Sequence, residues 1–256
     1  MKTSDADTPK IIKVADGFYV RLEVDNIAWI DLGDCALAVD ALERAELAEE
    51  VFDAIASTIG AKPVRWMLNT HTHYDHVALN DAFRRRYGSE IVNRLAGGLP
   101  PEGRWFEGPK RRVQMLPMPG CHTDEDCIVW APTDKALFVG DIFGWGLINL
   151  SAPLTDQTAE LLVETYGRLI DYGASAVIPG HGPLCATAEL KRWVDYFLWL
   201  RREVSQAIAG GKTDKQIAGQ LAAPADMKTW WRFVQWKHED SVTKVIGAIR
   251  RGRLGR

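Results

Sequence analysis

Short apolar runs and apolar stripes with helical spacing alternate along this chain. The runs are short, and some alternate with polar residues, so they predict strands. Asp25-Asn26 and Gly33-Asp34 separate the first three runs, and such dipeptides favour tight turns, so these runs predict a meander of hairpins. The predicted strands span residues 18–24, 28–32, 36–39, 64–69, 90–93, 113–116, 127–130, 136–139 and 176–179.

Other segments predict helices. Leu47, Val51 and Ile55 recur at helical spacing, and Gly60 with Pro63 ends this stripe. Residues 95–110, in contrast, form a connection rich in glycine and proline. The predicted helices span residues 45–59, 80–87, 155–172, 188–209, 212–221 and 230–251.

The order of strands, loop and helix occurs twice before residue 183, and the chain is helical beyond it. This order predicts an α/β protein with two facing mixed sheets covered by helices. We assign residues 1–185 to this domain and residues 186–256 to a C-terminal helical extension packed on it. The extension is rich in aromatic residues, which predicts packing against the sheets, a substrate wall or a homodimer face.

Composition narrows the possible partners. A chain of 256 residues, 46% of them hydrophobic, can bury a large core within one domain. A formal net charge of -3 gives no general attraction to nucleic acid or to an anionic membrane. Basic clusters such as Arg84-Arg85-Arg86 are short and scattered. We therefore expect a small-molecule substrate, with no nucleic-acid or membrane partner.

The N-terminal residues and the cysteines bear on location. Residues 1–9 are polar and acidic where a secretory signal would have an apolar core, and no apolar run is long enough to cross a bilayer. Cys35, Cys121, Cys127 and Cys185 form no C-x-x-C pair and are predicted to remain thiols in a reducing compartment. We therefore expect a cytoplasmic protein.

One stretch concentrates metal ligands. His71-Thr72-His73-Tyr74-Asp75-His76 follows the apolar run at residues 64–68 and contains three imidazoles and a carboxylate. In an extended or looping backbone His71 and His73 point to one side, and the turn that follows lets Asp75 and His76 face a second position. One ion would leave ligands unused, so the stretch predicts a site for two metals.

Further candidate ligands lie later in the chain. His122 and His181 each follow a Pro-Gly pair closely, and Asp141 ends the apolar run at residues 137–140. Loops at the ends of strands present such side chains at the rim of a sheet. His238 lies in a predicted helix without such a setting, and we expect it to be an ordinary structural residue.

With these residues the chain resembles the metallo-β-lactamase superfamily. The family motif H-x-H-x-D-H matches the six-residue stretch, and the family's later histidine, aspartate and histidine ligands fall on His122, Asp141 and His181. The resemblance implies a four-layer αββα sandwich with the metals at one edge. It also implies a first metal held by His71, His73 and His122, and a second held by Asp75, His76 and His181, with Asp141 bridging them.

The ligands and the resemblance together predict a metal-dependent hydrolase. Two divalent ions that share a water make hydroxide available at neutral pH, so a metal-bridging hydroxide would attack a small carbonyl substrate. Thioesters, lactones, esters and β-lactams are all such substrates. Asp75 is the candidate catalytic residue, because it can orient the nucleophile and pass on its proton. The imidazole-rich ligand set favours Zn2+, although iron or manganese also suits it.

Two other reaction classes stay open. A mononuclear-iron persulfide dioxygenase would use His71, His122 and Asp141, and a phosphodiesterase would use the same metals. Glyoxalase II itself is disfavoured, because no basic cluster near the C-terminus clearly matches a glutathione site. The chain also lacks the tyrosine that lactonases for acyl-homoserine lactones place shortly after the bridging aspartate.

Three residues near the candidate ligands have two interpretations each. Phe143 and Trp145 follow Asp141 and would either line an apolar substrate lip or pack beneath the helical extension. Asp126 would either hydrogen-bond the loop that carries His122 or be solvated with its acidic neighbours.

Overall fold

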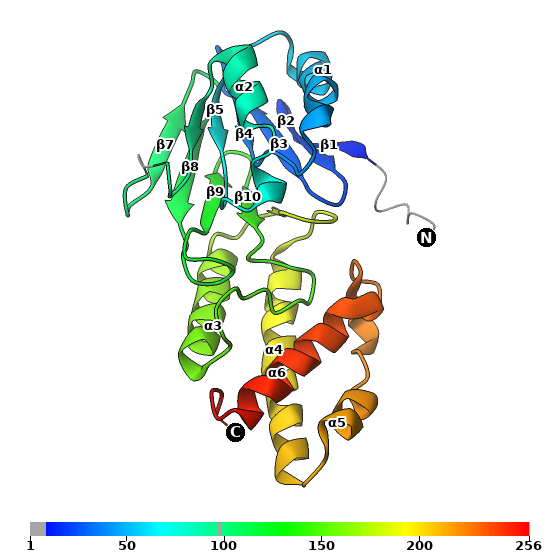
Figure 1. The fold of residues 1–256 in the computed structure, drawn as a ribbon. Coiled ribbons are helices and arrows are strands. Elements are labelled where there is room, and N and C mark those ends of the chain that lie inside the picture. The colour runs from blue at the N-terminus through cyan, green and yellow to red at the C-terminus, as the bar shows by residue number, and fades with distance from the viewer. Residues whose placement is uncertain (1–8, 97–98, 256) are drawn as a thin grey trace.

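The computed structural model describes residues 9–96 and 99–255, whose strands form two sheets (Figure 1). The prediction about a secretory signal concerns residues 1–9, of which residues 1–8 lie outside this part. The first sheet has the order β1-β2-β3-β4-β5-β6. Its strands are β1 (Lys10–Ala15), β2 (Phe18–Leu22), β3 (Ile27–Asp31), β4 (Ala36–Val39), β5 (Val64–Leu68) and β6 (Glu90–Val92). The hairpin meander β2 to β4 is confirmed, and a longer connection makes β4, β5 and β6 parallel.

The second sheet has the order β11-β10-β9-β8-β7. It is antiparallel except for β10 and β11, which are parallel and joined through helix α3 (Asp156–Asp171). Its strands are β7 (Arg104–Glu107), β8 (Arg112–Pro117), β9 (Cys127–Ala131), β10 (Ala136–Gly140) and β11 (Ala176–Pro179).

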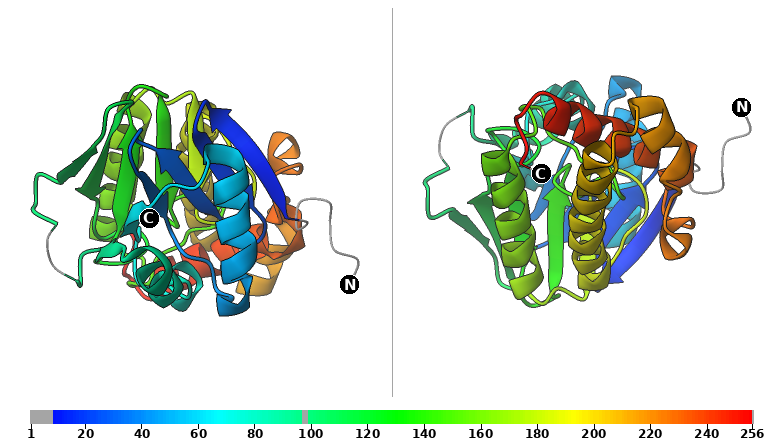
Figure 2. Two further views of the ribbon diagram at one scale, coloured as in Figure 1. Left: turned by 90° about the horizontal axis from the view of Figure 1, so that it is seen from above. Right: turned by 90° about the horizontal axis from the view of Figure 1, so that it is seen from below.

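Strand β3 shows how the layers stack, because all five of its residues are buried. Side chains alternate between the faces of a strand. Ala28 and Ile30 lie in the apolar cluster between the two sheets, whereas Ile27 and Trp29 lie in the cluster beneath helices α1 (Ala48–Ile59) and α2 (Asn80–Tyr87). Helices α3 and α4 (Thr187–Ala209) cover the second sheet, as the views in Figure 2 show. The predicted four-layer αββα sandwich is confirmed.

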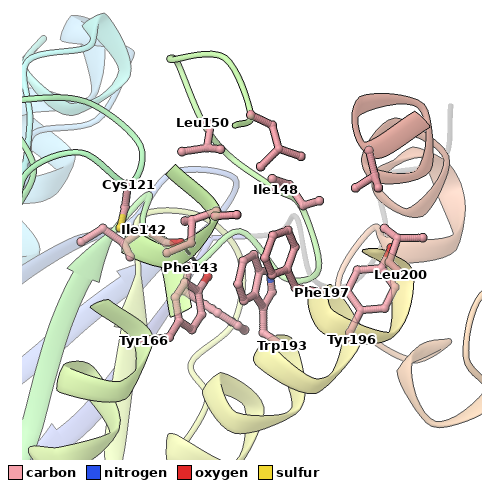
Figure 3. Packing of buried hydrophobic residues seen from close by; sticks show 14 of the residues in the cluster. Cys121, Ile142, Phe143, Ile148, Leu150, Tyr166, Trp193, Tyr196, Phe197 and Leu200 are labelled. Carbon is pink, nitrogen blue, oxygen red and sulfur yellow. Dashed lines mark hydrogen bonds between the residues drawn. The ribbon is translucent and has the colours of Figure 1, made fainter. Parts of the chain in front are cut away.

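The C-terminal segment joins the core on the outer face of the second sheet. Tyr166 on α3 stacks on Trp193 of α4 with ring centroids 4.0 Å apart, and Trp193 stacks on Phe197 at 5.4 Å (Figure 3). After α4 come α5 (Asp214–Gln220), a 3-10 helix (Ala225–Met227), a π-helical turn (Phe233–Lys237) and α6 (His238–Arg250). Because one apolar cluster runs from residues of the sandwich into these helices, the division at residues 185 and 186 stays a prediction.

Two strands were not predicted from the sequence. Strand β1 is an edge strand with no fully buried residue, so its apolar side chains give no clear pattern. Strand β7 is short and lies in the connection at residues 95–110. The last predicted helix, residues 230–251, was also wrong at its start, because Arg232 has a left-handed backbone and a π-helical turn precedes α6.

The structure bears on two further expectations, that the cysteines are thiols and that no segment crosses a membrane. The four cysteines are unpaired, and Cys35, Cys121 and Cys127 are buried. Within residues 9–96 and 99–255, no helix combines the length and the apolar character needed to span a membrane. The cytoplasmic location stays a prediction.

Candidate metal centre

The candidate ligands come from four loops at one edge of the sandwich. The six-residue stretch follows β5, His122 lies between β8 and β9, Asp141 follows β10, and His181 follows β11. The carboxyl ends of neighbouring parallel strands meet at one edge of a sheet. Strand β5 is parallel to β4 in the first sheet, and β10 is parallel to β11 in the second, so the loops that follow these strands lie at such edges. The loop after β10 then runs between the sheets and helices α4 and α6 (Figure 1).

Three histidines form one group of possible ligands. The ring of His71 lies 4.6 Å from that of His73 and 4.8 Å from that of His122, measured between centroids. Nε2 of His122 lies 3.0 Å from Nδ1 of His73. These nitrogen atoms converge closely enough to hold one metal ion.

A second group lies beside the first. It consists of Asp75, His76 and His181. Oδ2 of Asp75 lies 3.3 Å from Nε2 of His181 and 3.9 Å from Nε2 of His76. A mixed nitrogen and oxygen set of this kind also suits a divalent metal.

Asp141 lies between the two groups and presents a different oxygen to each. Its Oδ1 is 3.5 Å from Nε2 of His76 and 3.3 Å from Nε2 of His181. Its Oδ2 is 3.7 Å from Nε2 of His122. All seven predicted site residues therefore come together.

Several buried polar atoms among the candidate ligands have no hydrogen-bond partner, and they indicate whether a metal fits this site. Nε2 of His71, Nε2 of His76 and Oδ1 of Asp141 are buried and have no hydrogen-bond partner within the described chain. Leaving such atoms unpaired costs about 1–3 kcal/mol each. All three point into the cluster of candidate ligands. A bound cation would satisfy each of them, so the residues present fit a metal.

The other ring nitrogens of the histidines are held by the surrounding chain. Nδ1 of His76 lies 2.8 Å from Oδ2 of Asp40, and Nδ1 of His122 lies 3.0 Å from the carbonyl oxygen of Asn149. Nδ1 of His181 lies 2.9 Å from the carbonyl oxygen of Val24. An acceptor at Nδ1 places the hydrogen there and leaves the lone pair of Nε2 for a metal.

Asp40 and Asp126 position this site without belonging to the ligand set. Asp40 also accepts hydrogen bonds from the backbone N and the hydroxyl of Thr70, which precedes His71. Asp126 accepts a hydrogen bond of 2.6 Å from the backbone N of His122, so the first of its two interpretations is confirmed. Sequence reasoning missed Asp40, although it directly follows the buried strand β4 as Asp141 follows β10.

Electrostatics keep His71 neutral but favour positive charge beside Asp40 and Asp141. Burial, together with neighbouring His76, lowers the pKa of His71 to about 2, so this imidazole is neutral and offers a lone pair. Burial would also lower the pKa of His76, but Asp40 and Asp141 outweigh it and raise this pKa to about 9. Burial would raise the pKa of Asp141, yet His181 and His76 hold it well below its usual range. A buried carboxylate that stabilises cationic neighbours in this way also stabilises a metal cation.

A cavity of about 250 Å³ opens beside the second group. Asp141 and His181 line it, and residues of the C-terminal segment form another part of its wall. These wall residues are Trp231, Arg232, Trp236 and Lys237. The π-helical turn therefore lines a cavity, and its role as a substrate wall stays a prediction. Its position depends on tertiary contacts and has no local sequence signal.

Phe143, Trp145 and His238 do not line this cavity. Phe143 and Trp145 are buried, and their rings contact that of Trp230 at 5.9 and 5.5 Å, so they pack beneath the helical extension. His238 is the remaining histidine of the chain. Its ring nitrogens lie 2.9 Å from the hydroxyl of Tyr196 and 2.8 Å from the carbonyl oxygen of Leu221, which confirms a structural role.

Comparison with known proteins agrees with this fold and site. Residues 22–114 match the family model of the metallo-beta-lactamase superfamily. The chain is 30% identical over 211 residues to a hydroxyacylglutathione hydrolase of Brucella anthropi, covering 76% of this chain and 78% of that protein.

Two solved structures have a similar fold. A metallo-beta-lactamase from Pontibacter korlensis has a TM-score of 0.61 and 19% identity, covering 74% of this chain and 98% of that one. A stereoselective inverting sec-alkylsulfatase from a Pseudomonas species has a TM-score of 0.72 and 15% identity, covering 94% of this chain and 50% of that one. The chain therefore spans about half the length of the sulfatase.

A two-sheet sandwich with a histidine and aspartate cluster at its edge is the architecture of a metal-dependent hydrolase. The chain belongs to the metallo-beta-lactamase superfamily.

Proposed function

We propose that this protein is a dinuclear metal-dependent hydrolase of a small ester or thioester. The observation that carries the proposal is the position of Asp141, whose two oxygens face the two ligand groups separately. In this assignment His71, His73 and His122 would hold one ion, Asp75, His76 and His181 would hold the other, and Asp141 would contribute to both.

Zinc is the proposed metal. Five imidazoles and two carboxylates make up the ligand set, and imidazole-rich sites with few carboxylates favour Zn2+ over harder cations. Iron and manganese also accept such a mixed set, so the metal has to be identified by direct measurement.

The reaction would use both the metals and the surrounding side chains. Bound divalent ions supply an activated water and polarise the carbonyl of the substrate. Burial would raise the pKa of Asp75, but a hydrogen bond from His181 and the charge of His76 lower it, so this carboxylate is ionised at neutral pH. Asp75 can therefore orient the water and accept its proton.

The cavity beside the centre is suited to a small organic substrate. Its volume of about 250 Å³ and its two indole rings provide an apolar space next to His181. The similarity to a hydroxyacylglutathione hydrolase supports a thioester as the scissile group, because that relative's name describes an acyl–glutathione substrate.

The first test is metal content, measured by elemental mass spectrometry on protein purified without added metal, beside turnover of chromogenic thioester, ester, lactone and β-lactam substrates. We expect about two zinc ions per chain and thioester or ester hydrolysis that a chelator abolishes. A single iron, with oxygen consumption on a persulfide and no hydrolysis, would overturn the proposal in favour of the dioxygenase. Preferential turnover of a phosphodiester or of a secondary alkyl sulfate would overturn the choice of a carbonyl substrate.

Substitutions then test the ligand assignment. His73→Ala and Asp141→Ala should each lose metal and activity together, because each removes a proposed ligand. His238→Gln is the matched control, since His238 is a buried histidine bound to Tyr196 and Leu221 instead of the cluster. The control should lose thermal stability and keep its metal. Full activity in either ligand variant contradicts the assignment.

A further inference from the structure

Asn26 connects the first sheet to the loop that carries His181. It directly precedes β3 and is only 1% exposed. Its Nδ2 donates a hydrogen bond of 2.9 Å to the carbonyl oxygen of Pro179 and one of 2.8 Å to that of Gly182. Pro179 ends β11 of the second sheet, so these bonds join the two sheets.

The backbone of Asn26 extends this link. Its N atom donates a hydrogen bond of 2.8 Å to the carbonyl oxygen of Gly180. One residue thus binds the carbonyl oxygens of Pro179, Gly180 and Gly182, which are buried and flank His181 on both sides. A buried carbonyl oxygen without a partner is costly, so Asn26 determines the path of this loop.

The turn before β3 sets the orientation of the amide and of the His181 ring. Oδ1 of Asn26 accepts a hydrogen bond of 3.3 Å from the backbone N of Glu23, so the NH2 group, with its two hydrogens, faces the loop. In the same turn the carbonyl oxygen of Val24 accepts a hydrogen bond of 3.2 Å from the backbone N of Gly182. This oxygen also lies 2.9 Å from Nδ1 of His181. The turn therefore fixes both the backbone and the ring of this proposed ligand.

The loop lies directly against the metal centre. A Cβ at Gly180 would meet Oδ1 of Asp141 at 2.3 Å and Cε1 of His76 at 2.8 Å. A ligand set has to be held to within about 0.5 Å to bind its ion well. A shift of this loop would therefore change the position of His181 relative to Asp141 and His76.

The first ligand group does not depend on this link. His71 and His73 follow β5, and His122 lies between β8 and β9. Within the described residues, the side chain of Asn26 bonds only to its own turn and to the loop of His181. Loss of the amide would therefore release a ligand of the second group and leave the three ligands of the first in place.

We infer that Asn26 is a positioning residue for the second ion, because its amide holds His181 toward the other two ligands of that group. This inference rests on the proposed two-ion function and adds a residue that controls the occupancy of one of the two ions. Asn26 is not a ligand itself and acts through His181.

The test replaces the amide by a carboxylate of the same shape. In Asn26→Asp an oxygen takes the place of the NH2 group and faces the carbonyl oxygens of Pro179 and Gly182, so both hydrogen bonds are lost. Full-length protein is equilibrated at a fixed concentration of free Zn2+, and zinc per chain is measured by elemental mass spectrometry. Competition with a chelating dye then gives the dissociation constant of each ion.

We expect Asn26→Asp to weaken the binding of one ion by about 10- to 100-fold, as for other residues that orient a metal ligand, and to leave the other ion unchanged. Double variants identify which ion is affected. Adding Asn26→Asp to His181→Ala should not change the dissociation constant of the remaining ion, because both changes act on the same ligand. Adding it to His122→Ala should weaken the remaining ion by the full factor.

The matched control is Ser89→Ala. Ser89 is 3% exposed and donates a hydrogen bond to the carbonyl oxygen of Val64, at the start of β5, whereas the ligands follow the end of this strand. The control also loses a buried hydrogen bond to a backbone carbonyl, so it should lose thermal stability and keep both ions.

The outcomes separate the two proposals. A wild type that binds a single ion overturns the proposed function together with this inference. Two ions in the wild type, with the same two affinities in Asn26→Asp, overturn the inference alone. An equal loss of affinity at both ions also overturns it, because Asn26 would then support the whole centre. If Asn26→Asp does not fold, as judged by its thermal transition, Asn26→Ala takes its place, since it adds no charge. Failure of both variants to fold overturns the selective role.

Discussion

The carboxylate of Asp40 holds the imidazole of His76, with 2.8 Å between Oδ2 and Nδ1 and both side chains fully buried. Asp40 also accepts a hydrogen bond of 2.7 Å from the backbone N of Thr70. One side chain at the end of β4 thus fixes the ring of a proposed ligand and the start of the loop that carries the others. Its backbone is left-handed, with φ at 58°, a conformation that aspartate and asparagine tolerate better than most residues.

Asp40→Asn should weaken metal binding by about 10- to 100-fold without unfolding the protein. Asparagine keeps the shape and the left-handed backbone, but its NH2 group would face the N–H at Nδ1 of His76. The ring would then move its hydrogen to Nε2 and lose the lone pair meant for the metal. Zinc affinity measured by competition with a chelating dye checks this. Asp16→Asn is the control, because the side chain of Asp16 is 94% exposed, and equal affinities in the two variants would contradict the role of Asp40.

Asp126 holds the loop that carries His122, whereas its neighbour Asp124 faces the solvent. Asp126 accepts hydrogen bonds from the backbone N atoms of His122 and Thr123, whereas Asp124 is exposed. Asp126→Ala should lower metal content by releasing the loop that carries His122, and should lower the free energy of unfolding by about 1–3 kcal/mol. Asp124→Ala should change neither quantity. Unchanged metal content in Asp126→Ala would show that the loop holds its shape without the carboxylate.

Gly146 lies where the loop after β10 contacts the π-helical turn, so a substitution there tests this contact. Its φ is +92°, and a Cβ at this position would meet the ring of Phe233 at 2.3 Å. Gly146→Ala should therefore lower the free energy of unfolding by about 1–3 kcal/mol beyond the cost of the backbone conformation alone. Because the displaced turn lines the cavity beside the metal centre, kcat/KM should fall as well, while metal content stays near that of the wild type.

The control for this prediction is Gly211→Ala. Gly211 has a similar φ of +77°, but a Cβ there would meet nothing within 4 Å. It therefore carries the same backbone strain without a clash. Urea denaturation of both variants measures the difference, and equal losses of stability would mean that Phe233 and the turn move aside at no cost.

Buried strands and metal-binding loops were predictable because their signals are local. Strand β11 has the predicted bounds because it is a short apolar run that ends before Gly180. Helix α2 has the predicted bounds because Gly88, in the left-handed conformation, ends it. The candidate ligands were predictable because metal chemistry restricts the residue types, and most of the ligands stand next to one another or next to glycine. Their assignment to two ions remains a proposal.

The aromatic and cationic wall of the cavity was not predictable from the sequence. Trp231 and Lys237 lie about fifty residues beyond His181 along the chain, and helical periodicity over residues 230–251 gives no sign of the π-helical turn that brings them to it. The turn depends on packing, because Phe233 is fully buried beside Tyr196, with ring centroids 5.3 Å apart. Tertiary contacts of this kind override local preference.

Lys237 should make stability depend on pH between about 7 and 10.5. Burial, with a smaller contribution from Arg232, lowers the pKa of Lys237 from 10.5 to about 7, although the charge of Asp141 opposes this. The unfolded chain therefore binds a proton that the folded chain does not hold in this range, so stability rises with pH. Below pH 7 the lysine is charged in both states and the folded protein carries the full cost, a few kcal/mol at about 1.4 kcal/mol per pKa unit. Lys237→Met removes the charge, so in metal-free protein its free energy of unfolding should exceed that of the wild type most at pH 6 and approach it near pH 10. Urea denaturation of both proteins across this range measures the difference, and a difference that is constant or grows with pH would show that burial does not disfavour the charged lysine.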